Sequence, residues 1–320
     1  MNINIDDFKN LKAMVIGDLM VDEYLWGNVD RISPEAPVPI VCVTHESQTL
    51  GGAGNVINNL VSMGAHVIPI GTVGSGKAGQ MILDTLKTLD IDTDGIVSEP
   101  KRPTTRKTRV IASNQQVLRI DREIKTCINA QTLNKLVRII EKKINQVHLI
   151  IISDYDKGLV SKELVEKTVF LARQNNILVL ADPKALDFIK YEHVSVLTPN
   201  KKEAGIAAHM SIGSREDLFF AGKKLMSQVQ MDKLLITCGK DGMVLFEKDK
   251  EPYAIASKAR QVFDVSGAGD TVISLLGLGL ASGASFKDAA MVANAAAGIV
   301  IAKIGTATAT IEELKKELLS

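Results

Sequence analysis

Residues 262–282 read VFDVSGAGDTVISLLGLGLAS: a short β-like run, Val262–Val265, then a glycine turn, then an apolar segment with helical spacing. Gly267 and Gly269 let the backbone turn sharply and approach a ligand closely, because neither residue has a Cβ atom. The first turn of a helix presents free N–H groups at its positive end, which favours an anion. Asp270 lies in that turn, so its carboxylate is held beside the place where an anion would bind. The stretch predicts an anion site with a proton acceptor or, more simply, a glycine turn with a capping aspartate.

Composition indicates a globular protein with a sizeable core and no strong charge preference. The 320 residues are 46% hydrophobic, enough for one large α/β domain or two smaller ones. Lys and Arg number 38 against 37 Asp and Glu, so no basic patch predicts binding to nucleic acid or to an anionic membrane.

The cysteines and the apolar runs favour a cytoplasmic location. Cys42, Cys127 and Cys238 are few and far apart, as expected of reduced thiols. The N-terminus, MNINIDDFKN, is polar and acidic where a signal peptide needs a basic and then an apolar segment. The longest apolar runs, near 271–281 and 295–304, contain glycine and are too short for a membrane span. We therefore expect a soluble protein.

The chain alternates β-like and helix-like stretches. Strands expected at 148–153, 178–181 and 195–197 are separated by helices such as 161–174. This pattern predicts an α/β fold, in which a mostly parallel sheet is covered by helices on both faces. Ligands bind beyond the carboxyl ends of such strands. Polar residues or glycine occur there repeatedly: Asp18, Asp154, Asp182, Asn200, Gly239 and Asp264.

Residues 104–121 differ from their surroundings. Two β-like arms, Arg106–Ala112 and Gln116–Ile120, flank a turn and alternate polar with apolar side chains. Paired with the stretches 22–28 and 38–45, they predict a small sheet outside the main one.

Two near-motifs at residues 71–79 carry less weight. Gly74–Gly79 matches G-x-G-x-x-G, and Gly71–Ala78 nearly matches the P-loop, but Ala78 lacks the hydroxyl that would hold Mg²⁺. A tight strand-to-helix turn is the simpler interpretation.

Several separate elements together indicate phosphoryl transfer, in which catalysis is mostly positioning and charge stabilisation. Gly51–Asn55 allows close backbone approach and offers an amide. The spacing Thr237-x-Gly239-x-x-Gly242 gives a second glycine turn suited to a nucleotide. Asn200 and Glu203 could hold a hydrated Mg²⁺ through oxygen atoms.

These residues resemble the ribokinase or PfkB-type sugar kinases over essentially the whole chain. The resemblance rests on three elements: Asp264–Asp270, Gly51–Asn55 and Asn200–Glu203. Ser266 stands where many members have threonine, and Lys77 where relatives often have an acid. The resemblance implies a ribokinase-like three-layer αβα fold, with one kinase domain over 1–320 and a small β-sheet lid from about residues 20–45 and 104–121. It also implies ATP and Mg²⁺ as cofactors, and it leaves a monovalent cation open.

A narrower resemblance is to the D-glycero-D-manno-heptose 7-phosphate kinases of lipopolysaccharide core synthesis. It rests on four stretches: Gly17–Asp22, Arg31–Pro39, Asn114–Gln116 and Asp154–Gly158. Those enzymes phosphorylate the C1 hydroxyl to give the 1,7-bisphosphate in ADP-heptose synthesis, and often carry a fused nucleotidyltransferase. None of the five histidines forms the H-x-G-H of that second activity. We expect no nucleotidyltransferase domain here, in a stand-alone kinase or a kinase domain cut from a longer protein.

The resemblance implies a role for each candidate residue. Asp270 would be the catalytic proton acceptor, ionised near neutrality at the helix start, and the backbone of Gly267, Ala268 and Gly269 would form an anion hole. The sugar would be bound by Asp18, Asp22, Gly51, Gly52, Asn55, Asn114 and Gln116, and its phosphate by Lys107, Arg109, Lys157 and Lys184. The nucleotide would be bound by Asn200, Thr237, Gly239, Gly242, Asp264 and Asn294, and the metal through water by Asn200 and Glu203.

Simpler interpretations remain for many of these residues. Asp18 and Asp22 could be strand-end caps, the basic residues could be solvated, and Asn114 and Gln116 could be turn residues. The alanines beside Asn294 could serve helix packing alone.

The exposed lid predicts a homodimer. Four apolar side chains on it would be costly in water: Ile32, Val38, Ile40 and Val41. We expect the lids of two chains to pack together.

Two other functions stay open. The chain could phosphorylate another sugar, such as ribose, fructose 1-phosphate, a nucleoside or 2-keto-3-deoxygluconate. It could instead be a sugar-binding protein that kept the fold without turnover, although a pure binder needs no base such as Asp270.

Overall fold

The computed structural model describes residues 3–113, 115–184, 187–258, 264–303 and 305–319. Its centre is a nine-stranded sheet in the order β13-β12-β11-β10-β9-β8-β1-β4-β5. Neighbouring strands are parallel except at β11–β12 and β12–β13. The strands are β1 (Lys12–Gly17), β4 (His66–Val73), β5 (Ile96–Ser98), β8 (Leu149–Ser153), β9 (Leu178–Asp182), β10 (Val196–Leu197), β11 (Lys233–Thr237), β12 (Met243–Glu247) and β13 (Tyr253–Ile255).

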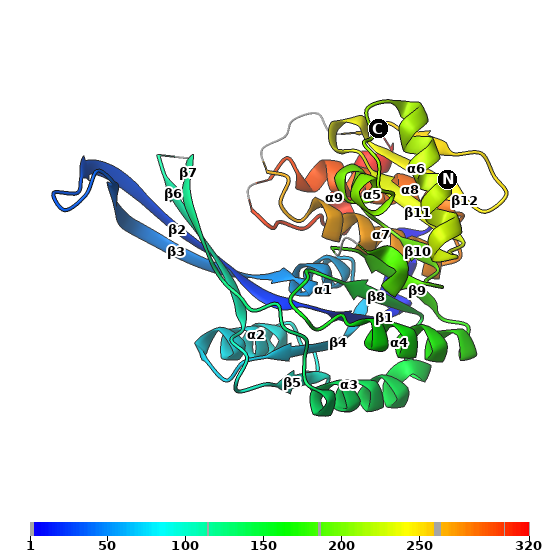
Figure 1. Ribbon diagram of the computed structural model, residues 1–320, viewed down its shortest axis with the longest axis horizontal. Helices are drawn as coiled ribbons and strands as arrows, with labels where there is room; N and C mark the ends of the chain where they lie inside the picture. The colour runs from blue at the N-terminus through cyan, green and yellow to red at the C-terminus, as the bar shows by residue number, and fades with distance from the viewer. Residues whose placement is uncertain (1–2, 114, 185–186, 259–263, 304, 320) are drawn as a thin grey trace.

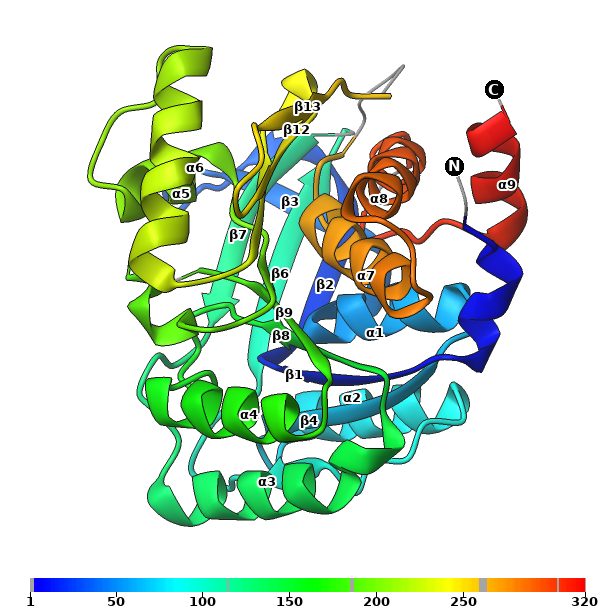
Figure 2. The same cartoon turned by 90° about the vertical axis from the view of Figure 1, so that its right-hand side faces the viewer.

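Two helical layers cover this sheet, because its central strands are apolar on both faces. In β1, Ala13 and Val15 belong to one buried cluster, while Met14 and Ile16 belong to the other. The first cluster includes residues of α1 (Ala53–Ser62), α2 (Lys77–Thr88), α7 (Ala268–Ala281), α8 (Phe286–Val300) and α9 (Ile311–Leu319). The second includes residues of α3 (Ala130–Lys143), α4 (Lys162–Gln174), α5 (Lys201–Ala207) and α6 (Arg215–Val229). The predicted three-layer αβα architecture is therefore confirmed (Figure 2).

Helix α7 packs against the central strands of the sheet, and its glycines allow a close approach. A Cβ atom on Gly277 would lie 2.7 Å from Leu149 Cδ1 of β8, and one on Gly279 would lie 2.7 Å from Ala289 Cβ of α8. Without those atoms α7 packs tightly against both neighbours. This packing fixes the N-terminus of α7, and hence Asp270, above the carboxyl ends of the central strands.

A second sheet of four strands, called here the lid, projects from the body (Figure 1). Its strands are β2 (Leu19–Ile32), β3 (Pro39–Gly52), β6 (Thr105–Ala112) and β7 (Gln115–Arg122), in the order β3-β2-β6-β7. β2 and β6 run parallel, and each forms an antiparallel pair with its other neighbour. The predicted small sheet is confirmed, although β2 and β3 are longer than the sequence indicated.

Some boundaries differ from those expected. Gly51 and Gly52 end β3, and α1 begins at Ala53. β13 was not expected, and Asp264 and Val265 lie outside any strand, while residues 259–263 fall outside the described residues. Short 3₁₀ segments also occur: η1 (Ile5–Asn10), η2 (Ile144–Gln146), η3 (Phe188–Tyr191) and η4 (Gly239–Asp241). Within the described ranges, we find no helix both long and apolar enough to span a membrane.

Candidate active site

The carboxylate of Asp270 lies at the centre of the candidate site. It belongs to the first turn of α7 and is only 4% exposed. Asn55 Nδ2, from the start of α1, donates to its Oδ2 at 2.7 Å, and the Tyr155 hydroxyl, from the loop after β8, donates to its Oδ1 at 2.7 Å. Three distant segments of the chain therefore meet at one carboxylate.

The environment of Asp270 raises its pKa from 3.8 to about 6. Burial is the largest cause, and the hydrogen bonds from Asn55 and Tyr155 act in the opposite direction. The nearby charge of Asp22 raises the pKa further, whereas Lys107 lowers it. Asp270 is thus mainly ionised at pH 7, as expected from the sequence, but it gains a proton under mildly acidic conditions.

The glycine turn before Asp270 requires glycine at residue 267. Gly267 has φ +81°, and a Cβ atom there would lie 2.5 Å from Asn55 Nδ2. The first N–H groups of a helix have no acceptor within the helix, so those of Gly269 and Asp270 suit an anion. The N–H of Ala268 is an exception, because it donates to the carbonyl oxygen of Val265 at 3.3 Å.

Asp264 supports this turn from outside the nucleotide pocket. Its Oδ1 accepts from the N–H of Ser266 at 2.8 Å and its Oδ2 from the N–H of Gly305 at 3.1 Å. Burial tends to raise its pKa, but these hydrogen bonds lower it overall. The contacts give Asp264 a role in holding the turn, which differs from the nucleotide contact expected.

Asp18 lies between β1 and β2 and holds the loop that follows β8. Its Oδ2 accepts from the backbone N–H groups of Tyr155 (2.9 Å) and Lys157 (3.2 Å), and its Oδ1 from that of Leu159 (3.3 Å). Burial raises its pKa to about 6, with a further increase from Asp154. The simpler interpretation of Asp18 as a cap thus has direct support, and its Oδ1 retains capacity for a ligand hydroxyl.

Gly51 and Gly52 let the lid pass close to the two aspartates. A Cβ atom on Gly51 would lie 2.2 Å from Asp22 Oδ2, and one on Gly52 would lie 2.5 Å from the carbonyl oxygen of Asp18. Gly52 also has φ +58°, which favours glycine. These glycines accommodate the protein's own chain, whatever they do for a ligand.

The four candidate phosphate-binding cations have different surroundings. Arg109 pairs with Asp22, and Lys157 Nζ with Glu123 at 2.9 Å. Lys184 Nζ lies 2.8 Å from Glu203, among the candidate metal ligands and away from the lid. Lys107 lies over the ring of Tyr155, 5.5 Å from its centroid. Burial lowers the pKa of Lys107, Asp22 opposes this, and Lys157 lowers it further, so two ammonium groups lie near each other.

A pocket of about 360 Å³ lies on the other side of the glycine turn. Most of the predicted nucleotide residues line it together with the turn itself: Thr237, Gly239, Gly242, Asn294, Ala268 and Gly269. Its other walls are mainly apolar, as suits a base. Asn294 donates from Nδ2 to the carbonyl oxygen of Ala256 at 2.8 Å, so it also fixes the pocket wall.

Asn200 and Glu203 form a capping box at the start of α5. The Asn200 side chain accepts from the N–H of Glu203 at 2.9 Å, and Glu203 Oε2 accepts from the N–H of Asn200 at 3.0 Å. Asp182, at the end of β9, is half-buried, and its desolvation together with the charges of Asp270 and Glu203 raises its pKa well above the usual range. Such an accumulation of negative charge fits a nearby divalent cation. Among the described residues, no three His, Cys, Asp or Glu side chains group as a direct ligand set.

One predicted residue, Gln116, lies apart from this group, and another, Asn114, falls outside the described residues. Gln116 is exposed on β7 and pairs with Ile111 of β6. Ile111 lies four residues along β6 from Lys107, which is about 13 Å at the usual strand rise. Gln116 belongs to the tip of the β6–β7 hairpin.

Sequence reasoning gave no role to two residues that belong to the site. Tyr155 was noted only within a resembling motif, and Asp182 only as a strand end. Tyr155 lies two residues after the end of β8, and Asp182 is the last residue of β9, at the sheet edge where ligands bind. That position was the available signal.

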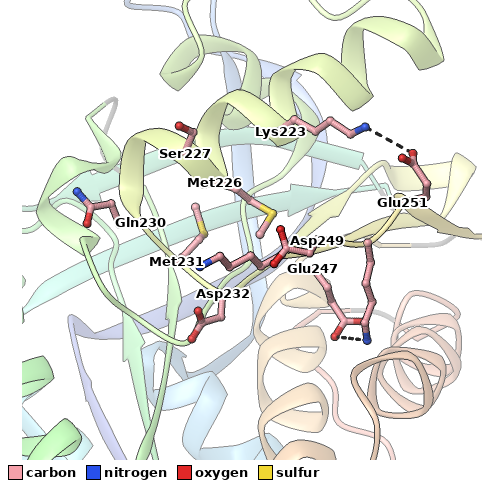
Figure 3. Close-up of a pocket in the computed structure, with 11 residues that line it drawn as sticks. Lys223, Met226, Ser227, Gln230, Met231, Asp232, Glu247, Asp249 and Glu251 are labelled. Atoms are coloured by element: carbon pink, nitrogen blue, oxygen red, sulfur yellow. Dashed lines mark hydrogen bonds and ion pairs between the residues drawn. The ribbon is translucent and has the colours of Figure 1, made fainter.

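A larger hollow of about 770 Å³ lies elsewhere, between the end of α6 and the β12–β13 turn (Figure 3). Four of its charged side chains form ion pairs, Lys223 with Glu251 at 3.5 Å and Lys250 with Glu247 at 3.2 Å. None of the predicted site residues lines it. It is an open, solvated surface groove.

The family of the chain is shown by sequence comparison. The model of the pfkB family of carbohydrate kinases matches residues 10–313, so the protein belongs to that family. Similar relatives include the bifunctional protein HldE of Desulfatibacillum aliphaticivorans, 49% identical over 99% of this chain and 65% of that protein. The HldE proteins of Helicobacter pylori (45% identical, 95% of this chain, 65% of that protein) and Geobacter sulfurreducens (44%, 95%, 62%) are also similar. The chain thus spans slightly under two thirds of these relatives.

Solved structures confirm the ribokinase-like fold. Phosphofructokinase-2 from Escherichia coli in complex with potassium gives a TM-score of 0.80 at 16% identity, covering 97% of this chain and 98% of that one. Arabidopsis thaliana ribokinase complexed with ribose and ATP gives 0.77 at 17% identity, covering 96% and 98%.

The raised pKa of Asp270 predicts a measurable pH effect on stability. The pKa of Asp270 is about 6 in the folded protein and 3.8 in the unfolded chain. The protonated carboxyl therefore contributes fully to stability below about pH 4, and this contribution is lost as the pH rises through 6. The loss is about 3 kcal/mol. The asparagine of the Asp270→Asn variant cannot ionise. The difference in free energy of unfolding, variant minus wild type, should therefore rise by about this amount between pH 4 and pH 7.5. Denaturant titrations of both proteins measure it, and a difference independent of pH would contradict the burial effect.

Proposed function

We propose that the protein transfers the γ-phosphoryl group of ATP to the C1 hydroxyl of D-glycero-D-manno-heptose 7-phosphate, in the cytoplasm, for ADP-heptose synthesis. One observation supports kinase chemistry most strongly: the buried Asp270 carboxylate lies at the start of α7, between the lid residues and the apolar pocket lined by Thr237 and Asn294. The choice of sugar rests on the stretches that resemble heptose 7-phosphate kinases and on similarity to the HldE proteins. Residues 1–320 would act as one kinase domain.

Asp270 would accept the proton of the C1 hydroxyl as that oxygen attacks the γ-phosphorus. The new P–O bond forms while the bond from phosphorus to the β–γ bridging oxygen breaks, and ADP leaves. The N–H groups at the start of α7 would stabilise the charge on the transferring group. Mg²⁺ bound through water to Asn200 and Glu203 would neutralise charge on the nucleotide phosphates.

The remote phosphate of the sugar would bind at Lys107 and Lys157. The two ammonium groups lie near each other beside the residues expected to bind the sugar, so they repel one another. A phosphate dianion bound between them would offset this repulsion. Arg109 pairs with Asp22, Lys184 with Glu203 and Lys157 with Glu123, so Lys107 is the strongest candidate of the four.

Replacement of Asp270 tests the reaction. Asp270→Asn should lower kcat by about 10²–10⁴ because the proton acceptor is lost, while sugar binding remains. A coupled ADP-release assay with Mg-ATP over a sugar panel measures it, and the heptose 7-phosphate should be the preferred acceptor. Asp288→Asn, in the first turn of α8, is the matched control and should keep activity. Turnover of another sugar would identify a different kinase, and no turnover by the wild type would favour a sugar-binding protein.

Replacement of Lys107 tests the phosphate subsite. Lys107→Met should lower kcat/KM for the phosphorylated sugar by roughly 10–100-fold, the value of a charge-assisted hydrogen bond. The effect on the same sugar without its phosphate should be small, which separates phosphate binding from general damage. Lys125→Met is the control, because Lys125 is exposed and pairs with Asp156. Equal losses on both sugars would contradict the assignment.

We also propose that two chains dimerise through their lids. The lid exposes apolar side chains, among them Ile32 (61% exposed) and Val38 (51%), far along the strands that project from the body (Figure 1). Burial of such a surface against a second copy would remove its cost in water.

Charges on the lid should separate the dimer. The double variant Ile32→Glu, Val38→Glu is expected to be monomeric where the wild type is dimeric, by light scattering at micromolar concentration. Phe220→Glu, at an equally exposed position on α6, should remain dimeric. A monomeric wild type would contradict the proposal.

A further inference from the structure

Tyr155 contacts the one carboxylate on which the proposed reaction depends. Its hydroxyl donates to Asp270 Oδ1 at 2.7 Å, while Asn55 Nδ2 donates to Oδ2 at 2.7 Å. Each carboxylate oxygen therefore has one fixed donor, and the two contacts together set the plane of the carboxylate. Each oxygen also retains a lone pair for a second donor, such as a substrate hydroxyl.

The position of the Tyr155 ring is itself held from several directions. Its backbone N–H donates to Asp18 Oδ2 at 2.9 Å, and Lys107 Nζ of the lid lies 5.5 Å from the ring centroid. The preceding residue, Asp154, accepts hydrogen bonds from the Tyr191 hydroxyl and pairs with Lys190. The hydroxyl is thus placed by the body and the lid together.

We propose that Tyr155 is a positioning residue, which orients the Asp270 carboxylate and keeps it available as a proton acceptor. The proposal rests on the role of Asp270 given above. Tyr155 itself transfers no proton in this scheme: burial, together with the charges of Asp270 and Asp182, raises the pKa of its phenol well above the usual range. The hydroxyl therefore remains a donor.

A hydrogen bond to the ionised carboxylate favours that form, so Tyr155 works against the effect of burial on Asp270. Other charges face the same carboxylate from neighbouring elements. They are Asp22 of β2, Lys107 of β6, Asp182 of β9 and Lys184 beyond it. All of them remain when only the hydroxyl is removed, so a change in proton affinity reports on that hydroxyl.

Tyr155→Phe removes the hydroxyl and keeps the ring. The carboxyl ¹³C resonance of Asp270, assigned by its absence in Asp270→Asn, can be followed by NMR as the pH changes. We expect its midpoint to move upward by about one pH unit in Tyr155→Phe, since a hydrogen bond to a charged group is worth about that much. An unchanged midpoint would overturn the proposal. This measurement needs no substrate, so it stands even if the sugar assignment fails.

Kinetics with any accepted sugar give a second test. Tyr155→Phe should lower kcat most at low pH and shift the acidic limb of the kcat profile upward by about one pH unit, with KM for the sugar changed less than about threefold. A rise in KM with unchanged kcat and an unshifted profile would make Tyr155 a sugar-binding residue and overturn the proposal.

Tyr191→Phe is the matched control. It removes another buried phenol that donates to a carboxylate, Asp154, without contacting Asp270. It should cost stability but leave the Asp270 midpoint in place. An equal shift in both variants would show a general effect of loosening the loop and would also overturn the proposal.

Discussion

The fold depends at its functional end on one constraint, the burial of an ionisable carboxylate between two hydrogen-bond donors. Hydrogen bonds from Asn55 and Tyr155 favour the charged form of Asp270 and so oppose the effect of burial. Asn55 comes from the helix that follows the lid strand β3, and Tyr155 from the loop beyond β8. The base of the lid, the edge of the main sheet and the start of α7 must therefore all be in place before the Asp270 carboxylate has both of its hydrogen-bond donors.

Charged groups of both signs surround this carboxylate. Asp22 and Lys107 approach it from the lid, and Asp182 and Lys184 from the body. Burial makes the arrangement costly in isolation, and bound ligands of opposite charge would offset that cost.

Much of this could be predicted from the sequence. Alternating strands and helices gave the layers, and the glycine turns and strand-end residues located Asp270, Asn55 and Asp18. The partners of each side chain could not be predicted, because pairing depends on distances between remote segments. Arg109 looked like a phosphate ligand but is paired with Asp22 across the lid, and Glu203 looked like a metal ligand but also caps α5 and binds Lys184. Tyr155 was overlooked because a tyrosine after a strand has no distinctive spacing.

The lid has a mechanical consequence that follows from its length. β2 has 14 residues, or about 45 Å at the usual rise, and it begins one residue after Asp18. The base of this strand therefore lies next to Asp18, while its other end lies far from the site. A rotation of the strand by about 10° about its base would move its far end by about 8 Å. A small displacement near the site would therefore become a large displacement at the far end of the lid.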